Sequence, residues 1–279
     1  MTSPPPDGSR DRRIEDPTNL WVIHPAARWL LPVALAWGVS ANVVSLVGLA
    51  LGIGAAISYW NWATPAAALL GLILSVAWLI ADGLDGMVAR ATGTASPFGR
   101  LLDGICDHGV FILIYVLIAT HIGTGEGWAL ALTAGGAHII QSSTYEAERA
   151  RFHRRVRGEA GTARPPRAGG VVEWLYDNIP RAIDRMAEPF DRLLRNSDDR
   201  KRLGAAYGDH ATPAMRFLAL ESANVRVYAI FLACLLGNPR WFWWFEIVPL
   251  TLILVIGLIW HRRAERWFTH PDRASAIPT

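Results

Sequence analysis

The chain has 279 residues, of which 52% are hydrophobic and only 18% are charged, and it contains 13 tryptophans. This composition is typical of a membrane protein rather than of an ordinary soluble domain. The net charge of +3 is small, and we expect no nucleic-acid partner. Cys106 and Cys234 both fall in apolar stretches, so the sequence predicts two small buried side chains rather than a disulfide framework or a zinc site.

The first 40 residues are predicted to form a cytosolic tail followed by an interfacial helix. Residues 1–18 are rich in Pro, Asp and Arg, so we expect them to be disordered, and they show no cleavable signal peptide. Residues 20–37 combine tryptophans with Arg28 and two prolines. That mixture suits a helix lying in the headgroup zone better than a helix that spans the bilayer.

Six apolar segments of roughly 20 residues follow, a length that fits the hydrocarbon thickness of a bilayer. The sequence therefore predicts an all-α polytopic membrane protein with six transmembrane helices, at about 41–59, 65–91, 98–121, 127–149, 213–236 and 241–260. The chain is predicted to have four parts. They are the tail and interfacial helix (1–40), the first four spans (41–149), an insertion (150–212), and the last two spans with a cytosolic tail (213–279).

The insertion at residues 150–212 holds no candidate span and is expected to be cytosolic. Residues 158–170 are rich in Gly, Pro and Arg and indicate a linker. Apolar residues at a spacing of three to four across 171–194 predict an amphipathic helix, interrupted at Pro180 and Pro189. This helix is expected either to lie on the membrane or over the mouth of a site, or to pack as a solvated helix on its own loop.

The positions of the basic residues predict the orientation in the membrane. With six spans, the tails, the turn with Arg90 and Arg100, and the insertion share one side. When Arg149 and Arg216 at the span ends are counted with the insertion, these segments hold all of the 27 Lys and Arg residues except Arg226 and Arg240. Positively charged loops stay in the cytoplasm. We therefore expect both termini, and the end of the second span, on the cytoplasmic side.

Four aspartates stand inside or beside two uncharged apolar stretches. Asp82 and Asp85 are three residues apart and Asp103 and Asp107 are four apart, so each pair shares one face of its helix. A carboxylate at membrane depth is costly and indicates a functional site by default. The four together form the candidate site of this chain.

The residues between the two aspartate pairs indicate a tight turn. Residues 93–97 read as the turn, with Ser96 as the N-cap of the next helix and Pro97 at its first position. Two antiparallel helices would then direct four carboxylates toward each other, and Arg90 alone offsets too little of their charge. Ligands that are all oxygen favour hard divalent cations such as Mg²⁺ or Mn²⁺.

At these residues the chain resembles a known family, the CDP-alcohol phosphotransferases. All eight fixed positions of the family signature are present at the family's spacing, namely Asp82, Asp85, Gly86, Ala89, Arg90, Gly99, Asp103 and Asp107. The motif covers 26 residues, and the six-span layout extends the resemblance over most of the chain. One mild departure is Ala41-Asn42, where similar segments of the family often carry Pro-Asn.

The resemblance implies roles for the motif residues. Asp82, Asp85 and Asp103 would hold metal ions, expected to be two, and Asp107 would be both a ligand and the general base. Gly86 would let the nucleotide approach the helix backbone and Arg90 would contact the donor, in a nucleotide-binding set of Asp82, Gly86, Ala89, Arg90 and Gly99. The alternatives are charge compensation for Arg90 and helix packing for the two glycines.

The resemblance also implies the reaction and the partners. A membrane enzyme of lipid synthesis would transfer a substituted phosphate from a CDP-alcohol to an alcohol acceptor, a lipid alcohol among those considered, and release CMP. Members of the family form homodimers through membrane helices. In this chain Gly48 and Gly52 are four residues apart in the first span, so they could form a dimer contact or pack within one subunit.

The acceptor pocket is predicted at the end of the fourth span. Family members with a phosphorylated acceptor carry Lys or Arg at the position of Ala147, which argues against such an acceptor here. We therefore expect a neutral or amine-bearing alcohol and predict an acceptor-binding group of Tyr145, Glu146, Arg149, Glu221 and Arg226. The alternative is that Glu146 pairs with Arg149, and Glu221 with a neighbouring arginine, for structural reasons.

Two other functions were weighed against the enzyme. Acidic residues in polytopic helices also mark cation transporters, whose sites usually lie near the bilayer midplane on broken helices. Here the aspartates gather at one membrane edge beside a basic loop, which favours a nucleotide enzyme. A membrane scaffold without activity is the weakest of the three, because all four aspartates are present.

Overall fold

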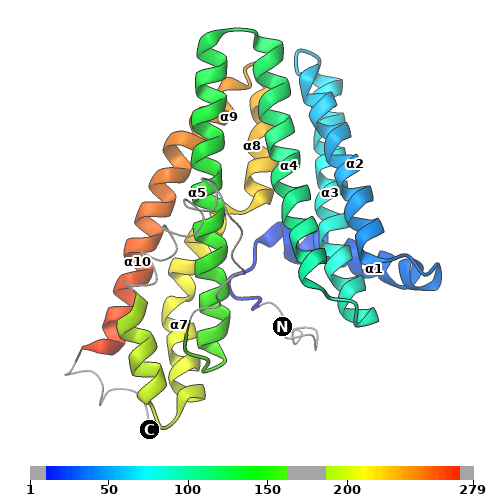
Figure 1. Ribbon diagram of the computed structural model, residues 1–279. Helices are drawn as coiled ribbons and strands as arrows, with labels where there is room; N and C mark the ends of the chain where they lie inside the picture. The colour runs from blue at the N-terminus through cyan, green and yellow to red at the C-terminus, as the bar shows by residue number, and fades with distance from the viewer. Residues whose placement is uncertain (1–10, 162–186, 271–279) are drawn as a thin grey trace. The chain divides into compact units, whose positions relative to one another are not determined.

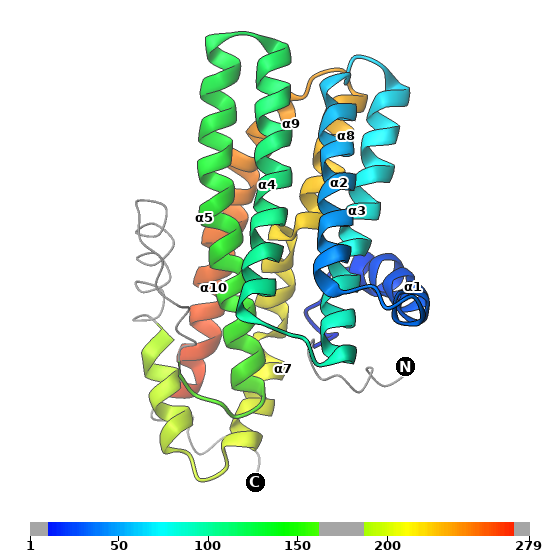
Figure 2. The ribbon, with the colours of Figure 1, turned by 45° about the vertical axis from the view of Figure 1, so that its right-hand side comes forward.

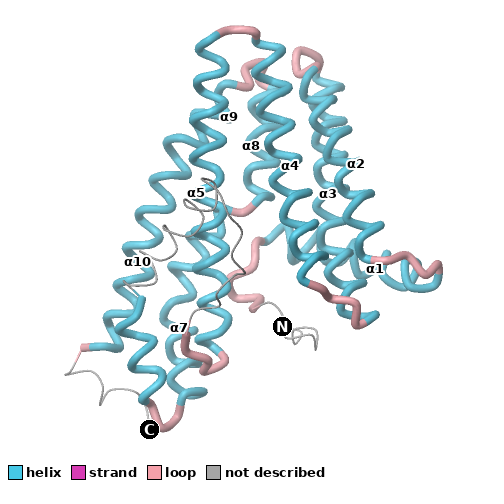
Figure 3. Tube along the Cα trace, in the orientation of Figure 1, coloured by secondary structure: helices cyan, strands magenta, loops and turns pink. Residues whose placement is uncertain are grey.

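The computed structural model describes residues 11–161 and 187–270, except for the side chains of residues 97, 98, 100–103, 105 and 107. The described chain is helical throughout and contains no strand, which confirms the predicted all-α class (Figure 3). It divides into two compact units. The motif unit comprises residues 16–136 and 223–247, and the second unit comprises the described residues before 16, from 137 to 222 and after 247.

Figure 1 shows the described helices in chain order. A π-helical turn, η1 (Asn19–Ile23), leads into α1 (His24–Ala36). The long helices are α2 (Ala41–Trp60), α3 (Pro65–Thr92), α4 (Pro97–Ile122) and α5 (Gly125–Val156). After the helical residues 187–196 come α7 (Arg200–Leu218), η2 (Ala219–Glu221), α8 (Ala223–Leu235), α9 (Arg240–Phe245), η3 (Glu246–Leu250) and α10 (Thr251–Thr269).

Local signals set the bounds of the helices that carry the motif. Pro65 stands at the first turn of α3, and Gly93 ends that helix with a φ of 66°. At the start of α4 the Ser96 hydroxyl accepts a hydrogen bond from the Gly99 amide at 3.0 Å, with Pro97 in the first turn. The predicted turn and its N-cap are confirmed. Thr64 precedes α3 as predicted but makes no side-chain cap bond.

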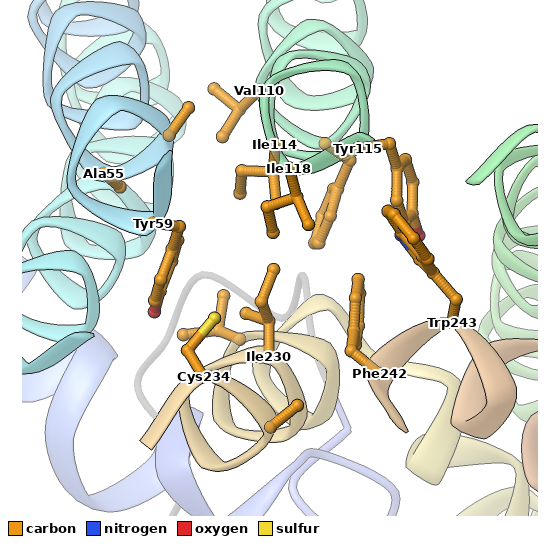
Figure 4. Packing of buried hydrophobic residues seen from close by; sticks show 14 of the residues in the cluster. Ala55, Tyr59, Val110, Ile114, Tyr115, Ile118, Ile230, Cys234, Phe242 and Trp243 are labelled. Atoms are coloured by element: carbon orange, nitrogen blue, oxygen red, sulfur yellow. The ribbon is translucent and has the colours of Figure 1, made fainter. Parts of the chain in front are cut away.

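The motif unit is built around α2, which packs against both α3 and α4 (Figure 2). The α3 and α4 helices also meet through Trp78 and Phe111, whose ring centroids lie 5.5 Å apart. Figure 4 shows the core, in which Val110, Ile114 and Ile118 of α4 face buried side chains of α2, α8 and α9. The predicted burial of Cys106 and Cys234 is confirmed, and both are free thiols.

Gly48 and Gly52 pack within the motif unit. A Cβ atom on Gly48 would lie 3.2 Å from the Ala81 Cβ, and one on Gly52 would lie 2.2 Å from a methyl group of Val110. Both glycines therefore serve the close approach of α2 to α3 and α4. Of the two roles predicted for this pair, the structure supports packing within one subunit.

We expect Gly52→Ala to lower the free energy of unfolding by about 1–3 kcal/mol, because the added methyl overpacks the stiff Val110 side chain. The matched control is Gly54→Ala on the same helix. There the added methyl would meet only the flexible end of Leu74, at 3.2 Å. Helix propensity favours alanine by up to about 1 kcal/mol, so the control should be neutral or stabilising. Chemical denaturation followed by circular dichroism compares the free energies of unfolding of the two variants. Equal effects would contradict the close packing of Gly52 against Val110.

The predicted fifth span is not one helix. The α7 helix begins at Arg200, and η2 and an extended Ser222 (φ −66°, ψ 154°) separate it from α8. Glu221 and Asn224, on either side of the break, are both buried. The hydropathy of residues 213–236 predicted a continuous helix, whereas buried polar residues at 221–224 favour an interruption with its own hydrogen bonds. The prediction of one continuous helix over 213–236 is therefore wrong, whereas a span made of two helices stays a prediction.

Within the described residues, three helical segments are long and apolar enough to cross a membrane by length and composition: Ala41–Trp60, Pro65–Thr92 and Arg240–Thr269. The broken pair of α7 and α8 would make a fourth, and His108–Ile122 is a shorter apolar helix. These helices support a membrane protein. The count of six spans stays a prediction.

The predicted disordered tail is ordered where the structure describes it. Ile14 is buried, and the Asp16 carboxylate accepts hydrogen bonds from the Thr18 amide at 2.7 Å and from the Asn224 side chain at 3.1 Å. Arg13 pairs with Asp209 at 2.5 Å. The prediction of disorder is therefore wrong for residues 11–18, and the rest of that tail lies outside the described residues. So do residues 162–186, which hold most of the predicted linker and amphipathic helix.

Candidate active site

The motif occupies the end of α3 and the start of α4 in the motif unit. Asp82 is half-buried and Asp85 is buried, with 7% of its surface exposed, within the last three turns of α3. Asp103 and Asp107 share a face of α4 by helical register, and their side chains lie outside the described residues. The two helices are joined by the short turn at residues 93–96, so both aspartate pairs lie near the same end of the helix pair.

A third helix contributes to this site, which the sequence reasoning did not anticipate. The Ser45 hydroxyl on α2 donates a hydrogen bond to Oδ2 of Asp85 at 2.5 Å. The Asn42 Oδ1 atom lies one turn earlier, 3.7 Å from where a Cβ on Gly99 would be. The signal was present as two polar residues three apart at the start of an apolar span. Ser45 thus holds one carboxylate of the motif in a fixed orientation.

The remaining motif residues surround the end of α3. The Nη1 atom of Arg90 lies 3.2 Å from where a Cβ on Gly86 would be, so the guanidinium folds back along the helix over the glycine. Arg90 is exposed and Ala89 is half-buried. A side chain at Gly86 would displace the Arg90 guanidinium, so these two motif positions depend on each other.

The described donors fit a hard divalent cation. Asp82 and Asp85 offer carboxylate oxygens from one face of α3, and α4 places two further aspartates on one of its own faces. No thiol or imidazole belongs to the motif, and a set of oxygen donors with four negative charges is suited to Mg²⁺ or Mn²⁺.

The predicted acceptor-binding residues fall in both units. In the second unit, Arg149 pairs with Glu146 at 3.1 Å and lies 6.0 Å from the ring centroid of the buried Tyr145. Glu221 is buried in η2 of the same unit, and Arg226 is buried in α8 of the motif unit. The pairing of Glu146 with Arg149 was the structural alternative, and it is present. An acceptor-binding role for these residues stays a prediction.

The second unit contains a buried cluster of charges that the sequence analysis missed. Arg155 of α5 pairs with Asp191 at 2.8 Å and with Glu265 of α10, and it donates to the Ala187 carbonyl at 3.0 Å. Its guanidinium carbon also lies 5.0 Å from the ring centroid of Phe190. All these side chains are buried. One arginine therefore joins α5, α10 and the helical residues 187–196.

Three buried side chains of the second unit, Glu265 among them, resemble a metal site in composition. Glu148, His261 and Glu265 bring possible ligand atoms within 4.8 Å of one another. Both carboxylates, however, accept hydrogen bonds from Arg262, and Arg151 also donates to Glu148. His261 uses Nδ1 on Glu148 at 2.6 Å and Nε2 on the Tyr207 hydroxyl at 2.7 Å. Because three arginines balance three carboxylates here, the cluster is an ion-pair network.

Removing Arg155 should destabilise the second unit strongly. Arg155→Met would leave the carboxylates of Asp191 and Glu265 buried without the arginine that pairs with both. Breaking a buried ion pair lowers the free energy of unfolding by about 3–5 kcal/mol. The control is Arg157→Met, which removes an exposed pair with Glu159 at 2.9 Å and should change stability by about 0.5 kcal/mol at most. Chemical denaturation of both variants makes the comparison, and similar small losses would show that Arg155 does not anchor the cluster.

Comparison with known proteins places this site in a family. Residues 38–162 match the family model described as CDP-alcohol phosphatidyltransferase. Cholinephosphotransferase 1 of Homo sapiens is 34% identical over 125 residues, which cover 41% of this chain and 29% of that protein. The Xenopus laevis protein of the same name is 29% identical over 127 residues, which again cover 41% of this chain and 29% of that protein.

A shorter match supports the same assignment. Archaetidylinositol phosphate synthase of Aeropyrum pernix is 45% identical over 53 residues, which cover 19% of this chain and 26% of that protein. The chain thus spans less than a third of the length of each of these relatives. The matched segment holds the motif with both aspartate pairs, so this part of the chain is similar to the CDP-alcohol phosphatidyltransferase family.

Proposed function

We propose that this protein is a membrane enzyme of phospholipid or related lipid synthesis, which transfers a substituted phosphate group from a CDP-alcohol to an acceptor hydroxyl and releases CMP. The observation that carries the proposal is the complete eight-position motif inside the matched segment, with Asp85 buried and held by Ser45. The comparisons offer no support for the alternative of a divalent-cation transporter.

The motif residues would divide the work as follows. In the reaction the acceptor oxygen bonds to the transferred phosphorus, the bond from that phosphorus to the CMP oxygen breaks, and Asp107 takes the hydroxyl proton. Asp82, Asp85 and Asp103, together with Asp107, would hold two Mg²⁺ or Mn²⁺ ions. When bound, these ions would offset the negative charge of the diphosphate.

The donor is held by the end of α3 in this proposal. Arg90, whose guanidinium folds over Gly86, would contact the nucleotide or its phosphates. Asp82, Ala89 and Gly99 complete the nucleotide-binding group. Ser45 keeps Asp85 in one orientation, so this carboxylate does not have to be ordered when the donor binds.

The substrates proposed are a CDP-linked polar head group and a lipid alcohol. The relatives named cholinephosphotransferase support this direction of transfer, and the absence of a cation at Ala147 agrees with an acceptor that lacks a phosphate. Acceptor contacts are assigned to Tyr145, Glu146, Arg149, Glu221 and Arg226. The relative named archaetidylinositol phosphate synthase supports the competing assignment, a phosphorylated soluble acceptor.

We also propose an arrangement in the membrane. Trp21, Trp29 and Trp37 are each at least 75% exposed around α1, which supports an interfacial position for η1 and α1. The distribution of arginines supports a cytoplasmic active site and cytoplasmic termini, with six spans and the insertion at 150–212 on that side. The expected assembly is a homodimer.

The test is CMP release by the purified protein in lipid nanodiscs with Mg²⁺. One arm offers CDP-choline or CDP-ethanolamine with diacylglycerol, and the other offers CDP-diacylglycerol with soluble alcohols, among them glycerol 3-phosphate. We expect release in the first arm, with the lipid product seen by mass spectrometry. Efficient use of glycerol 3-phosphate would overturn the substrate assignment, and no release in any arm would overturn the enzyme.

A further inference from the structure

One hydroxyl group outside the eight-position motif contacts a motif carboxylate directly. The Ser45 hydroxyl lies 2.5 Å from Oδ2 of Asp85 and 3.2 Å from the carbonyl oxygen of Ala41, one turn earlier on α2. A hydroxyl has one proton to donate, and an ionised carboxylate can only accept. The shorter distance and the charge of the carboxylate both favour Asp85 as the acceptor. Ser45 and Asp85 are each 7% exposed, so bulk water competes little for this hydrogen bond.

The packing of α2 against α3 fixes the place of this hydroxyl. The two helices lie side by side and run in opposite directions (Figure 2). A Cβ on Gly48 would lie 3.2 Å from the Ala81 Cβ, and a Cβ on Gly71 would lie 2.6 Å from the Tyr59 ring. Because contacts this close occur along the helix pair, a shift of α2 along α3 would create clashes. Ser45 therefore stays opposite the same carboxylate.

This hydrogen bond restricts how Asp85 can bind a cation. A carboxylate that binds an ion through both oxygens must turn both toward it, whereas Oδ2 of Asp85 is turned toward Ser45. Mg²⁺ demands near-ideal octahedral geometry, and the two oxygens of one carboxylate lie too close together to fill two octahedral positions well. Ca²⁺ is larger, takes more ligands and accepts carboxylates through one oxygen or through both. Binding through one oxygen thus suits Mg²⁺ and denies Ca²⁺ one of its two modes.

We propose that Ser45 is a positioning residue that makes Asp85 a ligand through one oxygen and thereby sets a preference for Mg²⁺ over Ca²⁺. This inference rests on the proposed function, which assigns Asp85 to the ions. Ser45 acts through the carboxylate and does not itself bind the ion, as outer-shell partners of metal ligands commonly do. A preference for the ion with the stricter geometry would hold the aspartates and the donor in one arrangement.

The test is the ion preference of Ser45→Ala. Loss of an outer-shell partner should raise the Mg²⁺ dissociation constant on the order of tenfold. The Ca²⁺ dissociation constant should stay equal or fall, because Asp85 can then turn both oxygens to the ion. Donor-free protein in nanodiscs of neutral lipid is loaded with Mn²⁺, which Mg²⁺ or Ca²⁺ then displaces, and electron paramagnetic resonance measures the free Mn²⁺. An unchanged ratio of the two dissociation constants would overturn the proposal, since a structural lesion weakens both ions alike.

Two further variants separate the hydroxyl from the packing around it. Ser58→Ala is the matched control, because Ser58 is equally buried on α2 and its hydroxyl donates to the Gly54 carbonyl at 2.8 Å. It should leave the ratio unchanged. Ser45→Thr keeps the hydroxyl and should keep the wild-type ratio, and a ratio like that of Ser45→Ala would overturn the proposal. Wild-type CMP release with Mg²⁺ tests the proposed function separately. Release together with an unchanged ratio in Ser45→Ala would remove the role of Ser45 and leave the enzyme.

Discussion

Removal of divalent cations is expected to abolish CMP release by this protein. Asp85 is buried. By helical register the four motif aspartates form two pairs, one on a single face of α3 and one on a single face of α4. Without cations, neighbouring carboxylates in a medium of low dielectric repel one another and an anionic donor as well. The measurement is CMP release in nanodiscs after dialysis against a chelator, followed by addition of Mg²⁺ or Mn²⁺, which should restore the rate.

A stability control separates loss of the site from loss of the fold. The ion-pair network of the second unit balances its own charges with Arg151, Arg155 and Arg262, so chelation should leave the unfolding transition of that unit unchanged. Full turnover after exhaustive chelation would contradict the assignment of the aspartates as metal ligands.

The helix pair that carries the motif could be predicted closely from the sequence, because its signals are local. Pro65, the glycine at 93 and the Ser96-Pro97 pair act within a few residues of the helix ends they define. The four aspartates were found for a similar reason, since charge in an apolar stretch can be read along the chain. Their grouping on helix faces follows from spacing alone.

The long-range contacts of the motif unit could not be read in that way. Ser45 and Asp85 are 40 positions apart, and Arg226 and Glu246 are 20 apart, so their pairing depends on how the helices pack. Hydropathy treated residues 213–236 as one apolar segment. It gave no weight to the hydrogen bonds that Asn224 makes with Asp16, Thr18 and Asn19, which hold the chain at the start of α8.

The buried charges of the second unit show the same limit. Arg155 and Glu265 are 110 positions apart, and each stands in a polar stretch that the sequence presents as solvated. Burial changes the meaning of such residues, because an exposed pair contributes little to stability while a broken buried pair costs several kcal/mol. Charge counting along the chain predicts a side of the membrane, but it could not show which arginines hold the fold together.

We expect Asp107→Asn to lower turnover at least about 100-fold, the usual scale for removal of a general base. Asparagine keeps the shape of the side chain but cannot take the proton of the acceptor hydroxyl. Donor binding should be less affected, because three carboxylates of the motif remain. Asp82→Asn and Asp85→Asn should instead weaken Mn²⁺ and donor binding together, since both residues are assigned to the metal ions.

Initial rates at saturating donor, and Mn²⁺ titrations of the same preparations, distinguish the two kinds of variant. The matched control is Asp198→Asn, an exposed aspartate of the second unit outside the motif, which should leave both measurements unchanged. If Asp107→Asn kept near-normal turnover, Asp107 would not be the base. The proton of the acceptor would then have to leave by a group outside the eight-position motif, since the proposal assigns Asp82, Asp85 and Asp103 to the ions.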